Sequence, residues 1–173
     1  MKVWCFLLSI PEVAMYTIED GYISYLRMHE SKILYNKPEL HQRPYIWITL
    51  RINNFQYLLP LSSSKEHKGK KVNNQLTTKI KDENNEVIAY IQHHNMIPCL
   101  DKHMTLIDMD NYKEYDRSYF DLLEKERLFI RANLESIIKK SLKVYQRRER
   151  VEFFQTICVD FPLLEEKCLE YEN

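Results

Sequence analysis

The stretch RPYIWITLRINNFQYLLPLSSSKEHK, residues 43–68, decides the fold. Between Pro44 and Leu61 it is rich in β-branched and aromatic residues, and the pair Asn53-Asn54 interrupts it. Asparagine tolerates the left-handed backbone conformation that a tight turn between antiparallel strands requires. The stretch therefore predicts a β-hairpin with the two asparagines in its turn.

Further strands and one long helix follow the hairpin. We expect a strand at residues 86–91 and shorter strands at residues 95–100 and 104–109, where Pro98 indicates an edge or a bulge. From about Arg117 to Arg150, apolar residues recur at three- and four-residue steps without glycine or proline. This spacing predicts one long amphipathic helix.

Two shorter helices complete the expected set. Asp160 is a good N-cap, and Pro162 follows in the first turn of a C-terminal helix. Residues 22–29 are ambiguous but fit a short helix. Because strands come first and helices afterwards, the expected fold class is α+β.

Composition excludes several classes of protein. The 173 residues suit one domain, and 45% of them are hydrophobic. The only glycines are Gly21 and Gly69, too far apart for a dinucleotide loop, a Walker loop or a G-x-S-x-G elbow. Basic and acidic residues number 25 each, so the formal net charge is zero. Zero charge removes the simplest sign of a nucleic-acid-binding domain, which is uniform basicity.

The charge is nevertheless unevenly distributed along the chain. Residues 65–82 hold six lysines and two acids, and residues 139–150 hold six basic residues and one acid. Residues 151–173 hold six acids and one lysine. The two basic segments could bind phosphate groups, or they could simply be solvated loop and helix surfaces.

Cysteine use and hydropathy indicate a cytoplasmic protein without a membrane partner. None of the four cysteines forms a C-x-x-C pair, so we expect reduced, buried thiols. The apolar run at residues 3–10 is too short to cross a bilayer, and no cleavage site follows it.

Possible chemistry is concentrated where the hairpin ends. Ser62, Ser63 and Ser64 follow the apolar strand directly, and Lys65 and His67 come next. Hydroxyl and ammonium groups are good ligands for phosphate oxygens. The alternative is an exposed polar loop, in which the single Gly69 permits a bend.

The sequence predicts neither a metal site nor a cofactor. His93 and His94 are adjacent, so on a strand their rings would point to opposite faces. Asp101, Asp108 and Asp110 lack the spacing of a calcium loop, and we expect them to cap a helix or to be exposed.

Five segments together resemble the ToxN/AbiQ endoribonucleases, the protein toxins of type III toxin–antitoxin and abortive-infection systems. They are residues 43–68, MIPCL (96–100), LFIRAN (128–133), FPLLEEKCLEY (161–171) and MYTIEDGYISYL (15–26). The resemblance covers residues 15–173 as a single domain. It leaves residues 1–14 as an N-terminal extension, and we expect Met15 to be the native start.

The resemblance implies a fold and an activity. The fold is a twisted antiparallel, barrel-like sheet of the Kid/MazF kind, with the long helix and the C-terminal helix packed on it. The activity is metal-independent cleavage of RNA by 2′-hydroxyl attack, leaving a 2′,3′-cyclic phosphate and a 5′-hydroxyl. The implied partners are target mRNA and a repeated pseudoknot antitoxin RNA, bound in a closed RNA–protein hetero-oligomer. DNA is not expected as a partner, and the implied role is phage abortive infection.

The resemblance also implies catalytic residues. Ser63 would hold the scissile phosphate or the 2′-hydroxyl, and Ser62 would add a hydrogen bond. Lys65 would offset the charge of the phosphorane and could supply the proton of the leaving group. Arg43 stands where the family has a lysine and would clamp phosphate, because arginine is no proton acceptor near neutral pH. Tyr35 matches an upstream family tyrosine.

Further residues are expected to bind RNA. Lys37 could serve as the base if the loop alignment shifts, and His67 is an alternative acid or base. The RNA groove would be extended by Lys68, Lys70, Lys71 and Lys79, and Arg131 would face RNA or form a structural ion pair. Two other functions stay open: a non-catalytic RNA-binding regulatory module, and a metal-dependent nuclease that uses the three aspartates.

Overall fold

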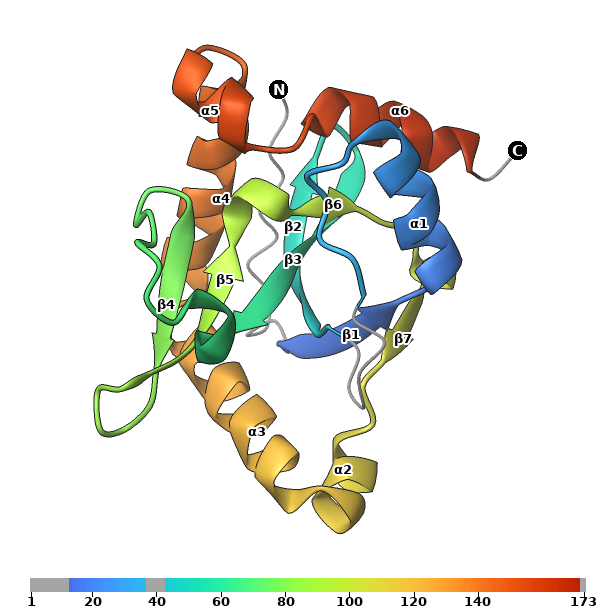
Figure 1. Cartoon of the computed structure of the whole chain (residues 1–173). Coiled ribbons are helices and arrows are strands. Elements are labelled where there is room, and N and C mark those ends of the chain that lie inside the picture. Colours follow the sequence, from blue (N-terminus) through green and yellow to red (C-terminus); the bar gives the residue numbers. More distant parts are fainter. Residues whose placement is uncertain (1–12, 37–42, 172–173) are drawn as a thin grey trace.

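A computed structural model describes residues 13–36 and 43–171 and contains the predicted hairpin. Strands β2 (Tyr45–Ile52) and β3 (Phe55–Ser63) are antiparallel, with Trp47 opposite Leu58. Asn53 and Asn54 form the turn, with φ of 50° and 70°. The register shifts between Trp47 and Arg51, and β2 is visibly bent in Figure 1. The hairpin prediction is confirmed.

The hairpin lies at the centre of a seven-stranded antiparallel sheet with the order β4-β5-β3-β2-β1-β7. Strand β3 pairs with β2 on one edge and with β6 and then β5 on the other, and the sheet curls around this strand (Figure 1). The α+β class with a twisted antiparallel sheet is confirmed. The remaining strands are β1 (Ala14–Ile18), β4 (Thr77–Lys81), β5 (Val87–Gln92), β6 (Ile97–Pro98) and β7 (Met104–Leu106).

Several strand predictions need correction. The strand expected at residues 86–91 is β5, but β6 and β7 are much shorter than predicted. Met109, the last residue of the strand predicted at residues 104–109, instead begins helix α2. Strands β1 and β4 were not predicted, since both are short and mix polar with apolar residues.

Six α-helices occur in the described ranges: α1 (Asp20–His29), α2 (Met109–Tyr115), α3 (Arg117–Ala132), α4 (Leu134–Arg148), α5 (Glu152–Ile157) and α6 (Phe161–Glu170). The prediction of a single long helix is wrong, because the chain leaves helical geometry at Asn133, where φ is −116°. The Asn133 side chain donates a hydrogen bond to the Phe129 carbonyl and so competes with the backbone pattern. Helix α3 packs against β4 and β5, and α1 lies beside α6 (Figure 1).

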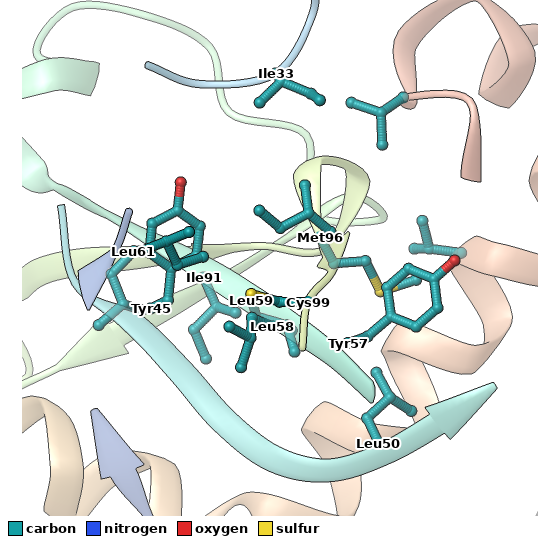
Figure 2. Close-up of a cluster of buried hydrophobic side chains, with 14 of the residues drawn as sticks. Ile33, Tyr45, Leu50, Tyr57, Leu58, Leu59, Leu61, Ile91, Met96 and Cys99 are labelled. Carbon is teal, nitrogen blue, oxygen red and sulfur yellow. The ribbon is translucent and has the colours of Figure 1, made fainter. Parts of the chain in front are cut away.

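The core is built around β3, which is buried on both sides. Tyr57, Leu58, Leu59 and Leu61 are each at most 1% exposed, and Figure 2 shows them packed with residues from several strands. Consecutive apolar residues suit a strand covered on both faces. The cysteines that the structure describes are free and buried, as predicted: Cys99, Cys158 and Cys168.

The carboxylate of Glu165 links helix α6 to the hairpin through hydrogen bonds. The hydroxyls of Tyr57 and Tyr145 both donate to Glu165 Oε1, at 2.7 and 2.9 Å. Asn53 in the hairpin turn donates to the Tyr145 hydroxyl at 2.9 Å. The helix starts as predicted, with Asp160 accepting from the Leu163 amide. The LLEEKC motif therefore stabilises the fold.

The first strand includes residues just before the expected domain start. Ala14 pairs with Trp47, and Val13 is only 3% exposed. The expected boundary between Ala14 and Met15 thus falls within β1. None of the helices in the described ranges is both long and apolar enough to cross a membrane.

Candidate active site

The end of β3 and the 3₁₀ helix η1 (Ser64–His67) open onto a cleft of about 550 Å³ that α3 also lines. The cleft brings together four of the residues predicted to be catalytic. Its polar lining consists of Arg43, Ser62, Ser63, Ser64, Lys65, Glu66, Glu86, Tyr119 and Glu126. A cleft with hydroxyl, ammonium and guanidinium groups is suited to a phosphodiester.

Ser62 is the buried centre of a hydrogen-bonded trio. Its Oγ accepts from Gln92 Nε2 at 2.7 Å and lies 2.8 Å from His67 Nε2. Burial lowers the pKa of His67, so its imidazole is neutral at neutral pH. Because Gln92 supplies a proton to Ser62, the Ser62 hydroxyl can donate its own proton to His67. The ring also packs on Tyr90, with centroids 4.5 Å apart.

Ser63 is placed by the start of η1. It is the N-cap residue of this helix and forms a capping box with Glu66, whose Oε1 accepts from the Ser63 amide at 3.3 Å. Ser63 is half-buried in the cleft, and Lys65 is exposed beside it. The local turn thus presents a hydroxyl and an ammonium group at the same opening.

Arg43 is largely committed to contacts within the protein. It is 7% exposed, its Nη1 donates to the Leu61 carbonyl at 2.7 Å, and its Nη2 pairs with Glu66 at 3.2 Å. Its Nε is buried and has no hydrogen-bond partner among the described residues. Arg43 therefore holds the end of β3 against η1.

Glu126 lines the same cleft and was not identified from the sequence. It lies on α3, is 3% exposed, and its Oε2 has no hydrogen-bond partner. Burial raises the pKa of this carboxyl to about 8. One sequence feature could have indicated that Glu126 is buried: it lies between Leu123 and Ile130 on the buried face of the helix. Gln92 was also missed, and no sequence pattern marks it.

Tyr35 and Arg131 do not belong to the lining of this cleft. Tyr35 is 54% exposed, with the Arg27 guanidinium 5.5 Å from its ring. Arg131 is exposed near the end of α3, and the cleft lining does not include it. Lys37 lies outside the described residues.

The four lysines expected to bind RNA that the structure describes are exposed. Lys68, Lys70 and Lys71 follow η1, and Gly69 between them has φ 75°, the bend that was predicted. Lys79 lies on β4, the strand at one edge of the sheet, opposite Tyr90 of β5. None of these four lysines belongs to the lining of the cleft.

The adjacent histidines are structural and do not lie on a strand. They fall in the 3₁₀ helix η2 (His93–Asn95). His93 is buried between Ser141 and Thr78, at 2.8 and 2.9 Å, and burial lowers its pKa to about 3. Across residues 13–36 and 43–171, no group of three or more His, Cys, Asp or Glu is arranged to hold a metal ion.

The three aspartates weighed as nuclease ligands have other placements. Asp108 caps α2 by accepting from the Asn111 amide at 3.1 Å, as expected of a helix cap. Asp101 and Asp110 are exposed.

Fold and site together define a small α+β protein whose curled antiparallel sheet ends at a cleft lined by hydroxyl, ammonium and guanidinium groups. A family model described as "Toxin ToxN, type III toxin-antitoxin system" matches residues 14–169. The chain belongs to this ToxN toxin family.

Curated relatives agree with this assignment. The chain is 35% identical to the endoribonuclease ToxN of Bacillus thuringiensis subsp. kurstaki over 165 residues, which cover 91% of this chain and 84% of the relative. It is 31% identical to the endoribonuclease AbiQ of Lactococcus lactis subsp. lactis, over 91% and 88% of the two chains. Like these relatives, the chain is an endoribonuclease.

Solved structures show the same fold. One, from a study of selective toxin inhibition by a non-coding RNA pseudoknot in type III systems, matches with a TM-score of 0.87 and 34% identity over 94% of this chain and 99% of that chain. The structure of AbiQ, a lactococcal anti-phage endoribonuclease, matches with a TM-score of 0.81 and 29% identity, again over 94% and 99%.

Proposed function

We propose that this protein is a metal-independent toxin that cleaves RNA by attack of a 2′-hydroxyl on the adjacent phosphorus. The products would be a 2′,3′-cyclic phosphate and a 5′-hydroxyl. The observation that carries the proposal is the cleft in which Ser62, Ser63, Lys65 and Arg43 meet. Such a reaction needs an aligned 2′-hydroxyl, a proton acceptor, stabilisation of the phosphorane and a proton for the leaving oxygen.

Each of the described groups suits one of these tasks. The Ser63 hydroxyl and the Lys65 ammonium would bind the oxygens of the scissile phosphate, and the unpartnered Nε of Arg43 would add a third donor. Neutral His67 would accept the proton of the 2′-hydroxyl by way of Ser62, whose hydroxyl would pass its own proton to His67 Nε2 as it takes up the proton of the 2′-hydroxyl. His67 would thus serve as the proton acceptor, a role that Arg43 cannot fill because arginine keeps its proton near neutral pH.

The biological setting follows from the relatives. One solved relative comes from work on toxin inhibition by a non-coding RNA pseudoknot, and another is anti-phage. We extend both properties to this chain: a repeated pseudoknot RNA, which the toxin processes, inhibits it in a closed RNA–protein assembly. Free toxin would cleave cytoplasmic transcripts during phage infection. The exposed lysines after η1 and the basic end of α4 offer surfaces for that RNA.

The direct test uses purified protein, an A-rich RNA and EDTA. Wild-type protein is expected to cut the RNA, and Ser63→Ala protein is expected to bind it without cutting. Intact RNA at high excess of wild-type protein would contradict catalysis and support a non-catalytic binding module. Activity that EDTA abolishes and added metal restores would instead favour a metal-dependent nuclease.

A separate test addresses the antitoxin. Protein expressed together with its upstream DNA should co-purify with short RNA repeats, in a complex whose mass includes several protein and RNA copies. Isolation of RNA-free protein, from a locus without tandem repeats, would contradict this part of the proposal.

A further inference from the structure

The cleft contains a buried carboxyl group on helix α3, that of Glu126. The proposed mechanism gives this group no role. Glu126 lines this cleft together with Ser63 and Lys65, although 61 or more positions separate it from them in sequence. Its Oε2 is shielded from solvent and has no hydrogen-bond partner. A buried polar atom without a partner is costly, and such atoms in native proteins often have a functional explanation.

A second unpartnered atom lines the same cleft. Arg43 Nε is also buried without a partner, while the two terminal nitrogens of Arg43 are bonded to the Leu61 carbonyl and to Glu66. Two residues of the cleft lining thus carry a buried donor nitrogen and a buried carboxyl oxygen that form no hydrogen bond among the described residues. A phosphodiester would supply oxygen atoms for both.

The surroundings of Glu126 favour its neutral, protonated form. The charged groups that line the cleft are Arg43, Lys65, Glu66 and Glu86, and Tyr119 lies on the same helix. Burial alone raises the pKa of Glu126, since no ion pair to it occurs among the described residues. The strands that pack on α3 add Lys79 and Lys81, which are exposed, and Tyr90, which packs on His67.

We propose that Glu126 is the general acid that protonates the departing 5′-oxygen of the RNA. This inference rests on the proposed function. In the step, the 2′-oxygen bonds to phosphorus and the bond from phosphorus to the 5′-oxygen breaks. The 2′-proton goes to His67 by way of Ser62, and the 5′-oxygen takes the carboxyl proton of Glu126. Exchange with water returns both side chains to their starting states.

Other groups in the cleft are less suited to this task. Arginine keeps its proton at any physiological pH, and its charge serves the phosphate better. Lys65 is an exposed cation placed to offset the charge of the phosphorane. A general acid works best when its pKa lies near the working pH, which a buried carboxyl satisfies.

The test compares two substrates that differ in one atom. An RNA with a single mapped cleavage site is made with oxygen or with sulfur at the bridging 5′ position of that site. Thiolate leaves without protonation, so sulfur removes the need for a general acid. Single-turnover rates are measured for wild type, Glu126→Gln and Glu114→Gln, the last being an exposed glutamate of α2 outside the cleft lining.

Glu126→Gln is expected to cut the oxygen substrate about 10²- to 10⁴-fold more slowly than wild type and the sulfur substrate at nearly the wild-type rate. Glu114→Gln should match wild type on both. Wild-type activity on the oxygen substrate should fall as pH rises through about 8, and Glu126→Gln should lack this fall. Glu126→Asp, which keeps an acid on a shorter side chain, should regain part of the rate.

Two results would overturn the inference alone. One is an equal loss by Glu126→Gln on both substrates, which indicates a structural role, and the other is an unchanged rate on the oxygen substrate. Wild-type protein that binds the RNA but cuts neither substrate would instead refute the proposed function, and the inference with it.

Discussion

Ser63 is the residue on which the proposed chemistry depends most directly. Ser63→Ala removes a hydroxyl at the cleft but leaves the backbone hydrogen bond to Glu66 intact. We expect cleavage to fall about 10²- to 10³-fold, the size of effect seen when one donor to a transition-state oxyanion is lost. Rate, RNA affinity and melting temperature are measured together. Ser64→Ala, next along the cleft, is the matched control and should cut within a few-fold of wild type.

The pH response of His67 is a second prediction at this scale. Burial lowers the pKa of His67 below its usual 6.5, so the neutral base persists to lower pH than for a free histidine. Cleavage should therefore hold steady near pH 7 and decline only in more acidic solution. His67→Gln should be slow at every pH, and exposed His29→Gln should be normal.

The same shift has a consequence for stability. The folded state holds the proton of His67 less tightly than the unfolded state does, so this group lowers the free energy of unfolding as pH falls through its unfolded pKa. His67→Gln should lose less stability than wild type below pH 6.5. An acid limb of the rate profile at or above pH 6.5 would contradict both statements.

The site residues differ in how far sequence could identify them. Ser62, Ser63 and Lys65 are consecutive or nearly so at a strand end, so local sequence groups them and the turn of η1 keeps them together. Glu126 comes from a distant helix, and its role depends on burial that only tertiary packing creates. Tyr35 was chosen by position in the chain, and the fold turns it to solvent.

At the scale of elements, one carboxylate joins α6 to α4 and to the hairpin. Glu165→Ala leaves the hydroxyls of Tyr57 and Tyr145 without their acceptor. We expect the free energy of unfolding to fall by about 1–3 kcal/mol, measured by urea titration. Glu166→Ala removes only an exposed contact to Lys167 and should change stability little. Equal effects of the two variants would contradict the structural role of Glu165.

Elements were predictable where a local pattern is strong. The hairpin followed from alternation and the asparagine turn, and α6 followed from Asp160 and Pro162. The break between α3 and α4 was missed because apolar spacing continues through Asn133, whose side chain turns back on the helix. Strand β1 was missed because it depends on partners far along the chain, β2 and β7, which local sequence does not reveal. Strand β4 was missed although it pairs with the next strand, β5, because it is short and mixes polar with apolar residues.

For the whole molecule, zero net charge is compatible with RNA binding because the charges are segregated. Replacing Lys68, Lys70 and Lys71 together by glutamine should weaken binding to single-stranded RNA of any sequence. The slope of log affinity against log salt should become shallower by about 2. Lys113→Gln, a single exposed lysine on α2, is the control and should leave the slope nearly unchanged. An unaltered slope in the triple variant would place the RNA on another face.

The most direct measurement of the central claim identifies the ends of the cut RNA. Purified wild-type protein is incubated in EDTA with an RNA that it cleaves, and the fragments are analysed by mass spectrometry. The account predicts 2′,3′-cyclic phosphates on the upstream fragments and 5′-hydroxyls on the downstream ones, with neither formed by Ser63→Ala protein. Fragments with 5′-phosphates and 3′-hydroxyls would show that water, not the 2′-hydroxyl, attacks the phosphorus, and would contradict it.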